Sequence, residues 1–140
     1  ELYEGLTGQP VTPADLLAQS ERVYTFQRLF ALRLGFGTRE HDYPPYRAMG
    51  PVTPTEYMSR AERYDQQLRD EVGVDPDTLT LDEKVARLRA FREAQYETLV
   101  DAVYKRRGWD ANGIPTLEKV RELGIDLPDV VELIRQKTGQ

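Results

Sequence analysis

Cysteine is missing from the whole sequence of 140 residues. Its absence excludes disulfides, thiolate nucleophiles, thiolate-bound zinc and cysteine-held iron–sulfur clusters within the chain. Histidine occurs once, as His41, which excludes a two-histidine metal site, and no serine stands in a nucleophile-elbow pattern. No apolar run approaches the roughly 20 residues that cross a bilayer, and no signal-peptide pattern opens the sequence. We therefore expect a soluble, cytoplasmic protein with no membrane contact.

Positive charge is in deficit, with 19 Lys and Arg against 24 Asp and Glu and a net charge of −5. Such a field repels a phosphate backbone, so we expect no nucleic-acid partner. Apolar residues at 39% and charged residues at 31% suit a globular protein with a charged surface, and the length predicts a single helical domain over residues 1–140. The chain begins at Glu1, which fits a shortened chain, a processed product or a separate subunit.

Apolar residues recur at helical intervals behind clear start signals, and no β-strand pattern competes with them. Thr53 with Glu56 and Thr80 with Glu83 form capping boxes, in which the hydroxyl and the carboxylate satisfy each other's free amides. Helices are predicted over residues 13–34, 54–72, 81–106, 116–123 and 128–137. The fold class is therefore all-α, a compact bundle of about five helices. A long Gly/Pro-rich loop over residues 36–50 follows the first long helix, because two consecutive prolines forbid a helix there.

Few residues are candidates for chemistry. Asp75, Asp77, Asp82 and Glu83 offer oxygen ligands for calcium, but the central glycine and final glutamate of an EF-hand loop are missing, so helix capping is the favoured interpretation. His41 and Asp42 are a possible acid–base pair, yet adjacent side chains usually point apart and nothing nearby completes a mechanism. We predict no catalytic, cofactor-binding or metal-binding residue in this chain.

Aromatic residues fall at two informative places. Tyr43 and Tyr46 flank Pro44-Pro45 and either line a substrate channel or pack against a neighbouring surface, and packing is favoured. Trp109 follows a helix end that Gly108 closes, where its ring is predicted to fold back as a buried plug. Arg107 and Asp110, on either side of Gly108-Trp109, are placed to pair across the turn.

Three ordered blocks resemble one known family. The blocks are Leu6-Thr7-Gly8 with Thr12-Pro13-Ala14-Asp15-Leu16-Leu17, then Glu21-Arg22-Val23-Tyr24 through Arg28-Leu29-Phe30 to Gly35, Arg39, Asp42, Pro44 and Arg47, and finally Tyr104 to Asp110 with Gly113-Ile114-Pro115-Thr116 and Leu123-Gly124-Ile125. The last block closely resembles the C-terminal ending of aldehyde ferredoxin oxidoreductases, which are tungstopterin enzymes.

The resemblance implies an enzyme that oxidises aldehydes to carboxylic acids, with a tungsten (or molybdenum) bis-pterin beside a [4Fe-4S] cluster and ferredoxin as electron acceptor. It also implies that this chain is only the tail, since the family's cluster cysteines, pterin-binding motif and catalytic residues belong to earlier segments. Its partners are then the remaining domains of the parent oxidoreductase. We expect it to bind no cofactor, to be inactive alone, and to supply scaffold and a wall of the substrate passage, with residues 36–50 nearest the cavity.

Two other hypotheses stay open at this point. A free-standing helical protein–protein interaction module would keep the family fold while binding some other protein. An enzyme in its own right would need clustered titratable residues in a pocket, whereas the sequence offers scattered ones. The tail hypothesis predicts an exposed apolar face larger than several hundred Å² where the missing domains dock.

Overall fold

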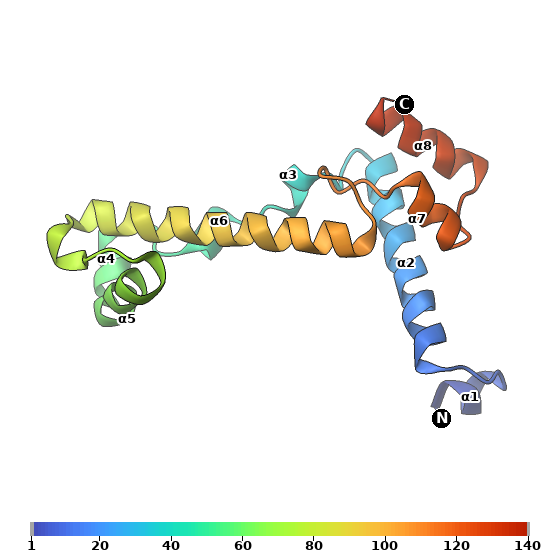
Figure 1. Ribbon diagram of the computed structural model, residues 1–140, viewed down its shortest axis with the longest axis horizontal. Helices are drawn as coiled ribbons and strands as arrows, with labels where there is room; N and C mark the ends of the chain where they lie inside the picture. The colour runs from blue at the N-terminus through green and yellow to red at the C-terminus, as the bar shows by residue number, and fades with distance from the viewer. Residues whose placement is uncertain (1, 140) are drawn as a thin grey trace. The chain divides into compact units, whose positions relative to one another are not determined.

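The computed structural model describes residues 2–139, and within them it contains eight α-helices (Figure 1). Over these residues the only extended pairing is an isolated bridge between Trp109 and Pro115. The all-α class is therefore confirmed. None of the helices in this described range is both long enough and apolar enough to cross a membrane.

The chain divides into two compact units. Unit 1 comprises the described parts of residues 1–42 and 103–140, and unit 2 comprises residues 43–102. Each unit has its own buried hydrophobic cluster. Whether the whole chain behaves as a single domain over residues 1–140 stays a prediction.

Unit 1 is built from helices whose starts and stops the sequence largely predicts. They are α1 (Leu2–Thr7), α2 (Pro13–Arg33), α3 (Arg39–Asp42), the last turn of α6 (Leu81–Arg107), α7 (Leu117–Glu122) and α8 (Pro128–Thr138). The predicted helices over residues 13–34, 81–106, 116–123 and 128–137 are confirmed to within one residue at each end. Helix α1 was not predicted, because its six residues carry no capping pattern.

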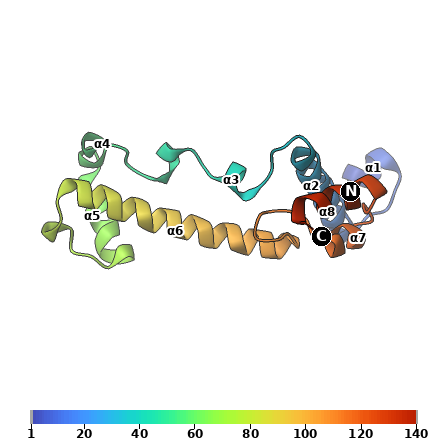
Figure 2. The same cartoon turned by 90° about the horizontal axis from the view of Figure 1, so that it is seen from above.

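The core of unit 1 lies where α7 and α8 pack beside α2 (Figures 1 and 2). Leu29 and Leu32 of α2 are 2% and 0% exposed. They meet a set of buried aliphatic side chains from the C-terminal segments: Ile114, Val120, Leu123, Ile125, Val130 and Ile134. Helix α8 therefore closes the core that α2 and α7 begin.

Local chemistry fixes the ends of these helices. Thr12 and Asp15 form a complete capping box, with the Thr12 amide donating to the Asp15 carboxylate at 2.8 Å and the Asp15 amide donating to the Thr12 hydroxyl at 3.2 Å. At the end of α6, Gly108 adopts a φ of +66°, and the Trp109 amide donates to the Tyr104 carbonyl at 2.9 Å. Glycine is the residue that takes this left-handed conformation without strain, so the helix stops there.

Unit 2 corrects one prediction, because the helix expected over residues 54–72 is not continuous. It consists of α4 (Pro54–Met58), α5 (Ala61–Gln67) and a π-helical turn (Leu68–Val72). The chain breaks at Arg60, whose φ and ψ are −142° and 32°. Just before it, the Ser59 hydroxyl donates to the Glu56 carbonyl at 2.7 Å, a side-chain bond that bends helices.

The break lets two tyrosines enter the same core. Tyr57 of α4 and Tyr64 of α5 have ring centroids 5.1 Å apart, and they pack with Leu68 and Leu88 in the hydrophobic cluster of unit 2. Figure 2 shows α4 and α5 beside the first half of α6. A single straight helix would place these residues along one line, whereas the bend folds them into a cluster.

The Gly/Pro-rich segment contains no helix through Pro44-Pro45, as predicted, but short helical turns flank the prolines. One is α3 in unit 1, and the other is a 3₁₀ turn at Tyr46–Met49 in unit 2. In unit 2, the Arg89 guanidinium lies 3.4 Å from the Tyr46 ring centroid and donates to the Tyr46 carbonyl at 2.9 Å. Arg89 of α6 therefore fixes the 3₁₀ turn at Tyr46–Met49 within unit 2.

Candidate functional site

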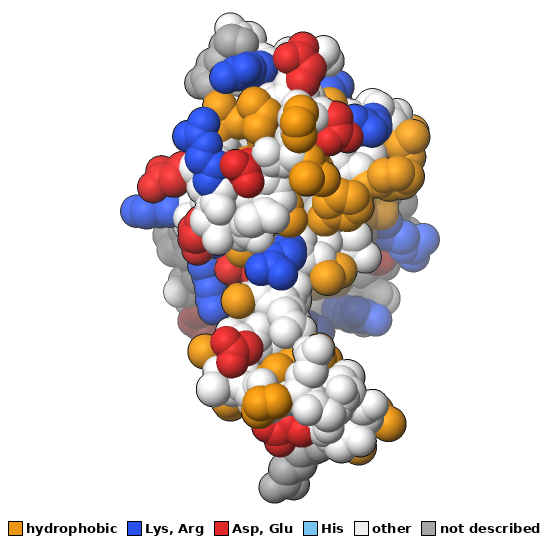
Figure 3. Space-filling view, turned by 90° about the vertical axis from the view of Figure 1, so that its right-hand side faces the viewer, with side chains coloured by type: hydrophobic (Ala, Val, Ile, Leu, Met, Phe, Trp, Pro, Cys, Tyr) orange, Lys and Arg blue, Asp and Glu red, His pale blue; other side chains and the backbone are white. Residues whose placement is uncertain are grey.

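A stripe of exposed apolar side chains runs along α2 and its C-cap. Its members recur every three to seven residues and share one side of the helix: Leu16, Val23, Phe26, Phe30 and Leu34. They are between 37% and 60% exposed. Figure 3 shows hydrophobic side chains gathered on a face of unit 1, with charged side chains around them. We call this set the α2 stripe.

The α2 stripe is separate from the face of α2 that builds the core. Leu29 is 2% exposed, whereas its neighbour Phe30 is 58% exposed. The sequence pattern of Leu16, Val23, Phe30 and Leu34 predicts the helix correctly, but these residues mark its exposed side. A helix whose two sides are both apolar is expected to bury both, so the second side indicates a missing neighbour.

Each of the five charged side chains of α2 binds a group within unit 1. The pairs are Asp15 with the Thr12 amide (2.8 Å), Glu21 with Lys119 (2.9 Å), Arg22 with the Leu123 carbonyl (2.8 Å), Arg28 with Asp42 (2.7 Å), and Arg33 with Asp129 (2.9 Å). Gln19, Ser20 and Gln27, which share this side of the helix, are uncharged, while Arg33 borders the stripe beside Phe26 and Phe30.

A shallow apolar hollow adjoins the α2 stripe between α2 and α8. Its lining is Phe26, Leu29, Phe30, Arg33, Asp129, Val130 and Leu133. The ion pair of Arg33 and Asp129 closes one edge, and both of its side chains are more than half exposed. The hollow contains no titratable group besides this pair, so it suits an apolar side chain of a neighbour better than a polar ligand.

A largely enclosed polar group in unit 1 consists of Arg28, Asp42 and Tyr104, which we call the Arg28 cluster. The guanidinium donates to both carboxylate oxygens of Asp42 at 2.7 Å, and the Tyr104 hydroxyl donates to the same carboxylate. Arg28 also donates from Nε to the Gly113 carbonyl at 2.9 Å. The Arg28 side chain is 9% exposed and Tyr104 is 4% exposed.

Electrostatics keep the Arg28 cluster in one protonation state near neutral pH. Burial favours the neutral form of Asp42, but the hydrogen bonds from Arg28 and Tyr104 outweigh burial and hold the pKa of this carboxyl below its usual range. Burial, together with the bond to Asp42, raises the pKa of Tyr104 to about 12. The Asp42 side chain is 32% exposed, and a partly buried ion pair with fixed protonation suits a structural role rather than proton transfer.

The other residues singled out from the sequence have local roles. His41 Nδ1 lies 2.7 Å from the Thr38 hydroxyl, while the Asp42 carboxylate belongs to the Arg28 cluster, so the two neighbours bind different partners. In unit 2, Tyr43 packs edge-on against Tyr96 with centroids 5.6 Å apart. Tyr43 and Tyr46 are 43% and 62% exposed, so both pack only in part.

Trp109 is 7% exposed, which confirms the predicted buried plug. The prediction that Arg107 pairs with Asp110 is wrong. The Arg107 guanidinium lies over the Tyr24 ring, 3.9 Å from its centroid. The Asp110 carboxylate instead accepts the amides of Asn112 and Ile114 at 2.9 and 2.8 Å. Asp110 therefore shapes the turn that follows the tryptophan, because a short acceptor side chain can bind amides two and four residues on.

Two of the four acidic residues considered for calcium, Asp75 and Glu83, act as caps. The Asp75 side chain accepts the Asp77 amide at 3.1 Å, and the Glu83 carboxylate accepts the Thr80 amide at 2.8 Å. Across residues 2–139, no three side chains of His, Asp or Glu gather as metal ligands would. For Asp75 and Glu83, the capping role favoured from the sequence is confirmed.

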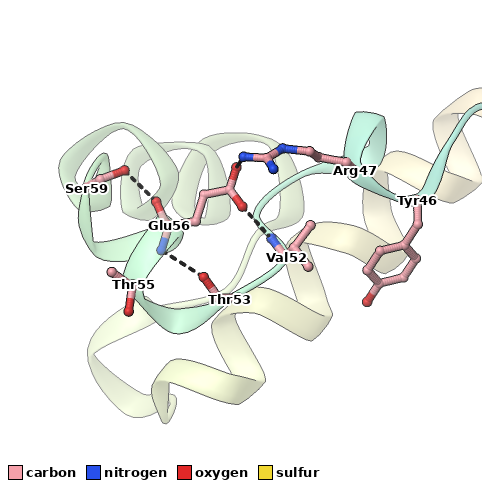
Figure 4. Close-up of a pocket in the computed structure, with 7 residues that line it drawn as sticks. All are labelled: Tyr46, Arg47, Val52, Thr53, Thr55, Glu56 and Ser59. Atoms are coloured by element: carbon pink, nitrogen blue, oxygen red, sulfur yellow. Dashed lines mark hydrogen bonds and ion pairs between the residues drawn. The ribbon is translucent and has the colours of Figure 1, made fainter.

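A surface depression of unit 2 also turns out to be used for capping (Figure 4). Glu56 is at its centre: the carboxylate accepts the Val52 amide at 3.1 Å and pairs with Arg47 at 3.6 Å, and its amide donates to the Thr53 hydroxyl at 3.2 Å. The predicted capping box is therefore only half formed, since the carboxylate binds the amide of Val52 rather than that of Thr53. The polar groups at the centre of the depression, which belong to Glu56, Arg47, Val52 and Thr53, bind one another and are not free to bind a ligand.

One protein-family model matches most of the chain. A family model described as aldehyde ferredoxin oxidoreductase, domains 2 & 3, matches residues 1–125. The matched region includes the α2 stripe and the Arg28 cluster, while α8 lies outside it. Comparisons with curated proteins and with solved structures find no match.

Proposed function

Because the chain belongs to the aldehyde ferredoxin oxidoreductase family, we propose that it is the C-terminal helical part of an enzyme that oxidises aldehydes to carboxylic acids and passes the electrons to ferredoxin. The resemblance of its sequence blocks to the end of such enzymes supports the reaction and the acceptor. The chain's own contribution is scaffold: it supports the parts of the enzyme that hold the cofactor and helps keep water from them.

The residues of this chain do not fit the cofactors of such an enzyme. An iron–sulfur cluster is held by thiolates, and the sequence contains no cysteine. The described residues also gather no set of metal ligands. We therefore propose that the tungsten or molybdenum bis-pterin and the [4Fe-4S] cluster are held by the remaining domains, and that no side chain here takes part in a chemical step.

The observation that carries the proposal is the α2 stripe. The α2 stripe presents five apolar side chains that are 37–60% exposed, and two of them are aromatic, a residue class enriched at protein interfaces. Fully burying one large apolar side chain contributes about 1.5–3 kcal/mol, and Phe26 and Phe30 are each about half exposed in this chain. The remaining domains of the same enzyme are the neighbour that we propose covers this face.

We further propose that residues 36–50 form the part of this chain nearest the substrate passage. Between the short turns at Arg39–Asp42 and Tyr46–Met49, glycines and prolines keep this backbone out of longer regular helices, and loop segments of this kind often carry functional residues. Phe36 in unit 1 and Tyr46 in unit 2 are 59% and 62% exposed, so each offers an aromatic surface. Replacing them one at a time by alanine in the complete enzyme should alter the preference among aldehydes of different size.

Metal analysis of the natural protein tests the proposed function. The polypeptide that carries this sequence is purified from its native source, and tungsten, molybdenum and iron are measured by mass spectrometry alongside aldehyde oxidation with a redox dye. We expect iron together with tungsten or molybdenum, and activity, in that preparation, but no activity in the 140-residue chain alone. A metal-free preparation bound to an unrelated protein would instead support the interaction-module hypothesis.

A further inference from the structure

Unit 2 is an insertion within unit 1. The chain leaves unit 1 after Asp42 and returns to it at Val103, so both ends of unit 2 are attached to the other unit. Helix α6 makes the return, since its residues up to 102 belong to unit 2 and the rest belong to unit 1. Insertions of this kind are tolerated where the two connection points of the host lie close together.

The Arg28 cluster holds these two points. Asp42 is the last residue before unit 2, and Tyr104 is the second residue after it. The Tyr104 hydroxyl donates to the Asp42 carboxylate, and Arg28 donates to both Asp42 oxygens at 2.7 Å and to the Tyr104 hydroxyl at 3.3 Å. Exit and return of the chain are thus bound to one guanidinium on α2.

Further contacts of unit 1 reinforce the same two segments. The Arg39 amide donates to the Asn112 carbonyl at 2.9 Å, and the Arg39 guanidinium lies 5.7 Å from the Tyr104 ring centroid. Arg28 reaches the Gly113 carbonyl at 2.9 Å. Helix α3 and the turn after α6 are therefore joined by bonds that use no residue of unit 2.

The hydrophobic clusters are divided in the same way. The cluster of unit 2 consists of Tyr57, Tyr64, Leu68 and Leu88, with partly buried side chains from residues 61–85 around it. Every residue of the unit 1 cluster lies either in α2 or after residue 113. Neither cluster includes a residue of the other unit, so the loss of one core removes no side chain from the other.

We propose that unit 2 opens as a separate cooperative unit, and that the Arg28 cluster confines this opening to residues 43–102. When unit 2 opens, α6 unwinds from its N-terminal end and stops before Val103. Tyr104 then stays bound to Asp42 and Arg28. Local unfolding in contiguous units is a general property of native proteins, and here the boundary is set by a partly buried ion pair. Unit 2 is then able to reorganise while the α2 stripe keeps its shape.

The test uses the full chain and two probes. Trp109 is the only tryptophan and lies in unit 1, so its fluorescence reports the unfolding of unit 1 alone. Hydrogen exchange followed by mass spectrometry reports both units. Leu68→Ala, at a position that is 0% exposed, should lower the protection of unit 2 amides by more than about tenfold and leave the denaturation midpoint of Trp109 unchanged.

Tyr104→Phe supplies the second arm, because it removes the hydroxyl that joins the two connection points and leaves the ring. In the Tyr104→Phe background, Leu68→Ala should shift the Trp109 midpoint, as a double-mutant cycle measures. Val120→Ala in unit 1 is the matched control, and it should shift the Trp109 midpoint in either background. The proposal is overturned if Leu68→Ala alone shifts the Trp109 midpoint as far as Val120→Ala does, or if its effect is the same with and without the hydroxyl. Both readouts concern folding alone, so they are independent of the proposed enzymatic role.

Discussion

The ring of Tyr24 lies nearly parallel to the indole of Trp109, with centroids 6.1 Å apart and planes inclined by 14°. The Arg28 guanidinium is 4.8 Å from the indole centroid. Arg107, at the end of α6, lies over the outer Tyr24 ring. The segment Arg107-Gly108-Trp109-Asp110 therefore joins the end of α6 to α2. The contacts are ring stacking between Tyr24 and Trp109 and cation–π contacts from Arg28 and Arg107, and both kinds of contact are favourable.

Trp109→Ala should lower the free energy of unfolding by about 3–5 kcal/mol, because it removes a large side chain that is 7% exposed. Urea denaturation followed by circular dichroism measures this loss, since the variant has no tryptophan fluorescence. Tyr24→Ala is the control, and its ring is 49% exposed, so a smaller loss is expected. An unchanged urea midpoint for Trp109→Ala would show that the indole does not act as a plug.

Two adjacent residues, Leu29 and Phe30, lie on different faces of α2, so replacing each one tests the buried and the exposed face separately. Leu29→Ala should cost about 2–5 kcal/mol because it opens a cavity in the unit 1 core. Phe30→Ser should cost less than about 1 kcal/mol, because Phe30 is 58% exposed, and should reduce the binding of an apolar fluorescent dye. Thermal denaturation and dye titration of the isolated chain measure both effects. Equal losses of stability would mean that α2 has a single buried face.

Two glycines test how closely the Arg28 cluster is packed. Gly113 and Gly73 both have positive φ, at 79° and 76°, so alanine strains the backbone similarly at either position. A Cβ at residue 113 would lie 2.1 Å from Arg28 Nη2, whereas a Cβ at residue 73 meets nothing within 4 Å. Gly113→Ala should therefore lower the melting temperature clearly more than Gly73→Ala. Similar melting temperatures for the two variants would contradict the packing described around Arg28.

Because of Asp42, the free energy of unfolding should fall at acid pH. Its pKa is lowered in the folded state, because the bonds from Arg28 and Tyr104 outweigh the effect of burial. A lowered pKa adds stability above the unfolded-state pKa of about 3.9, and this stability is lost as the pH falls through the lower folded-state value. Asp42→Asn should reduce stability at neutral pH and flatten the decline below about pH 4. Urea midpoints measured between neutral pH and pH 2 test this, and an unaltered acid slope would count against it.

Much of this fold is predictable from local chemistry. The threonine caps at Thr12, Thr80 and Thr116 and the glycine stop at Gly108 act over a few residues, so the sequence contains all the information that sets these helix ends. The break at Arg60 is different. Besides the local Ser59 bond, it accompanies the packing of Tyr57 and Tyr64 into one cluster, and tertiary packing of this kind overrides the helical preference of the local sequence.

The candidate site was less predictable for a related reason. Leu16, Val23, Phe30 and Leu34 share a helical spacing whether they face a core or a missing neighbour, so the pattern predicts the helix but not which side is buried. The Arg28 cluster brings together residues that are 14 and 76 positions apart in the sequence. Only the fold shows that Arg28, Asp42 and Tyr104 meet.

The central claim is that the α2 stripe docks onto the remaining domains of a metal-containing oxidoreductase, and metal retention in paired variants tests it most directly. Phe30→Glu and Met58→Glu each replace an exposed apolar side chain by a carboxylate. Phe30 is 58% exposed and lies in the α2 stripe, whereas Met58 is 59% exposed and lies in unit 2. Each change is made in the native gene, and tungsten, molybdenum and iron are measured per purified polypeptide. Phe30→Glu should reduce the metal content sharply, while Met58→Glu should match the unaltered protein. Full retention of metal in Phe30→Glu would contradict the account.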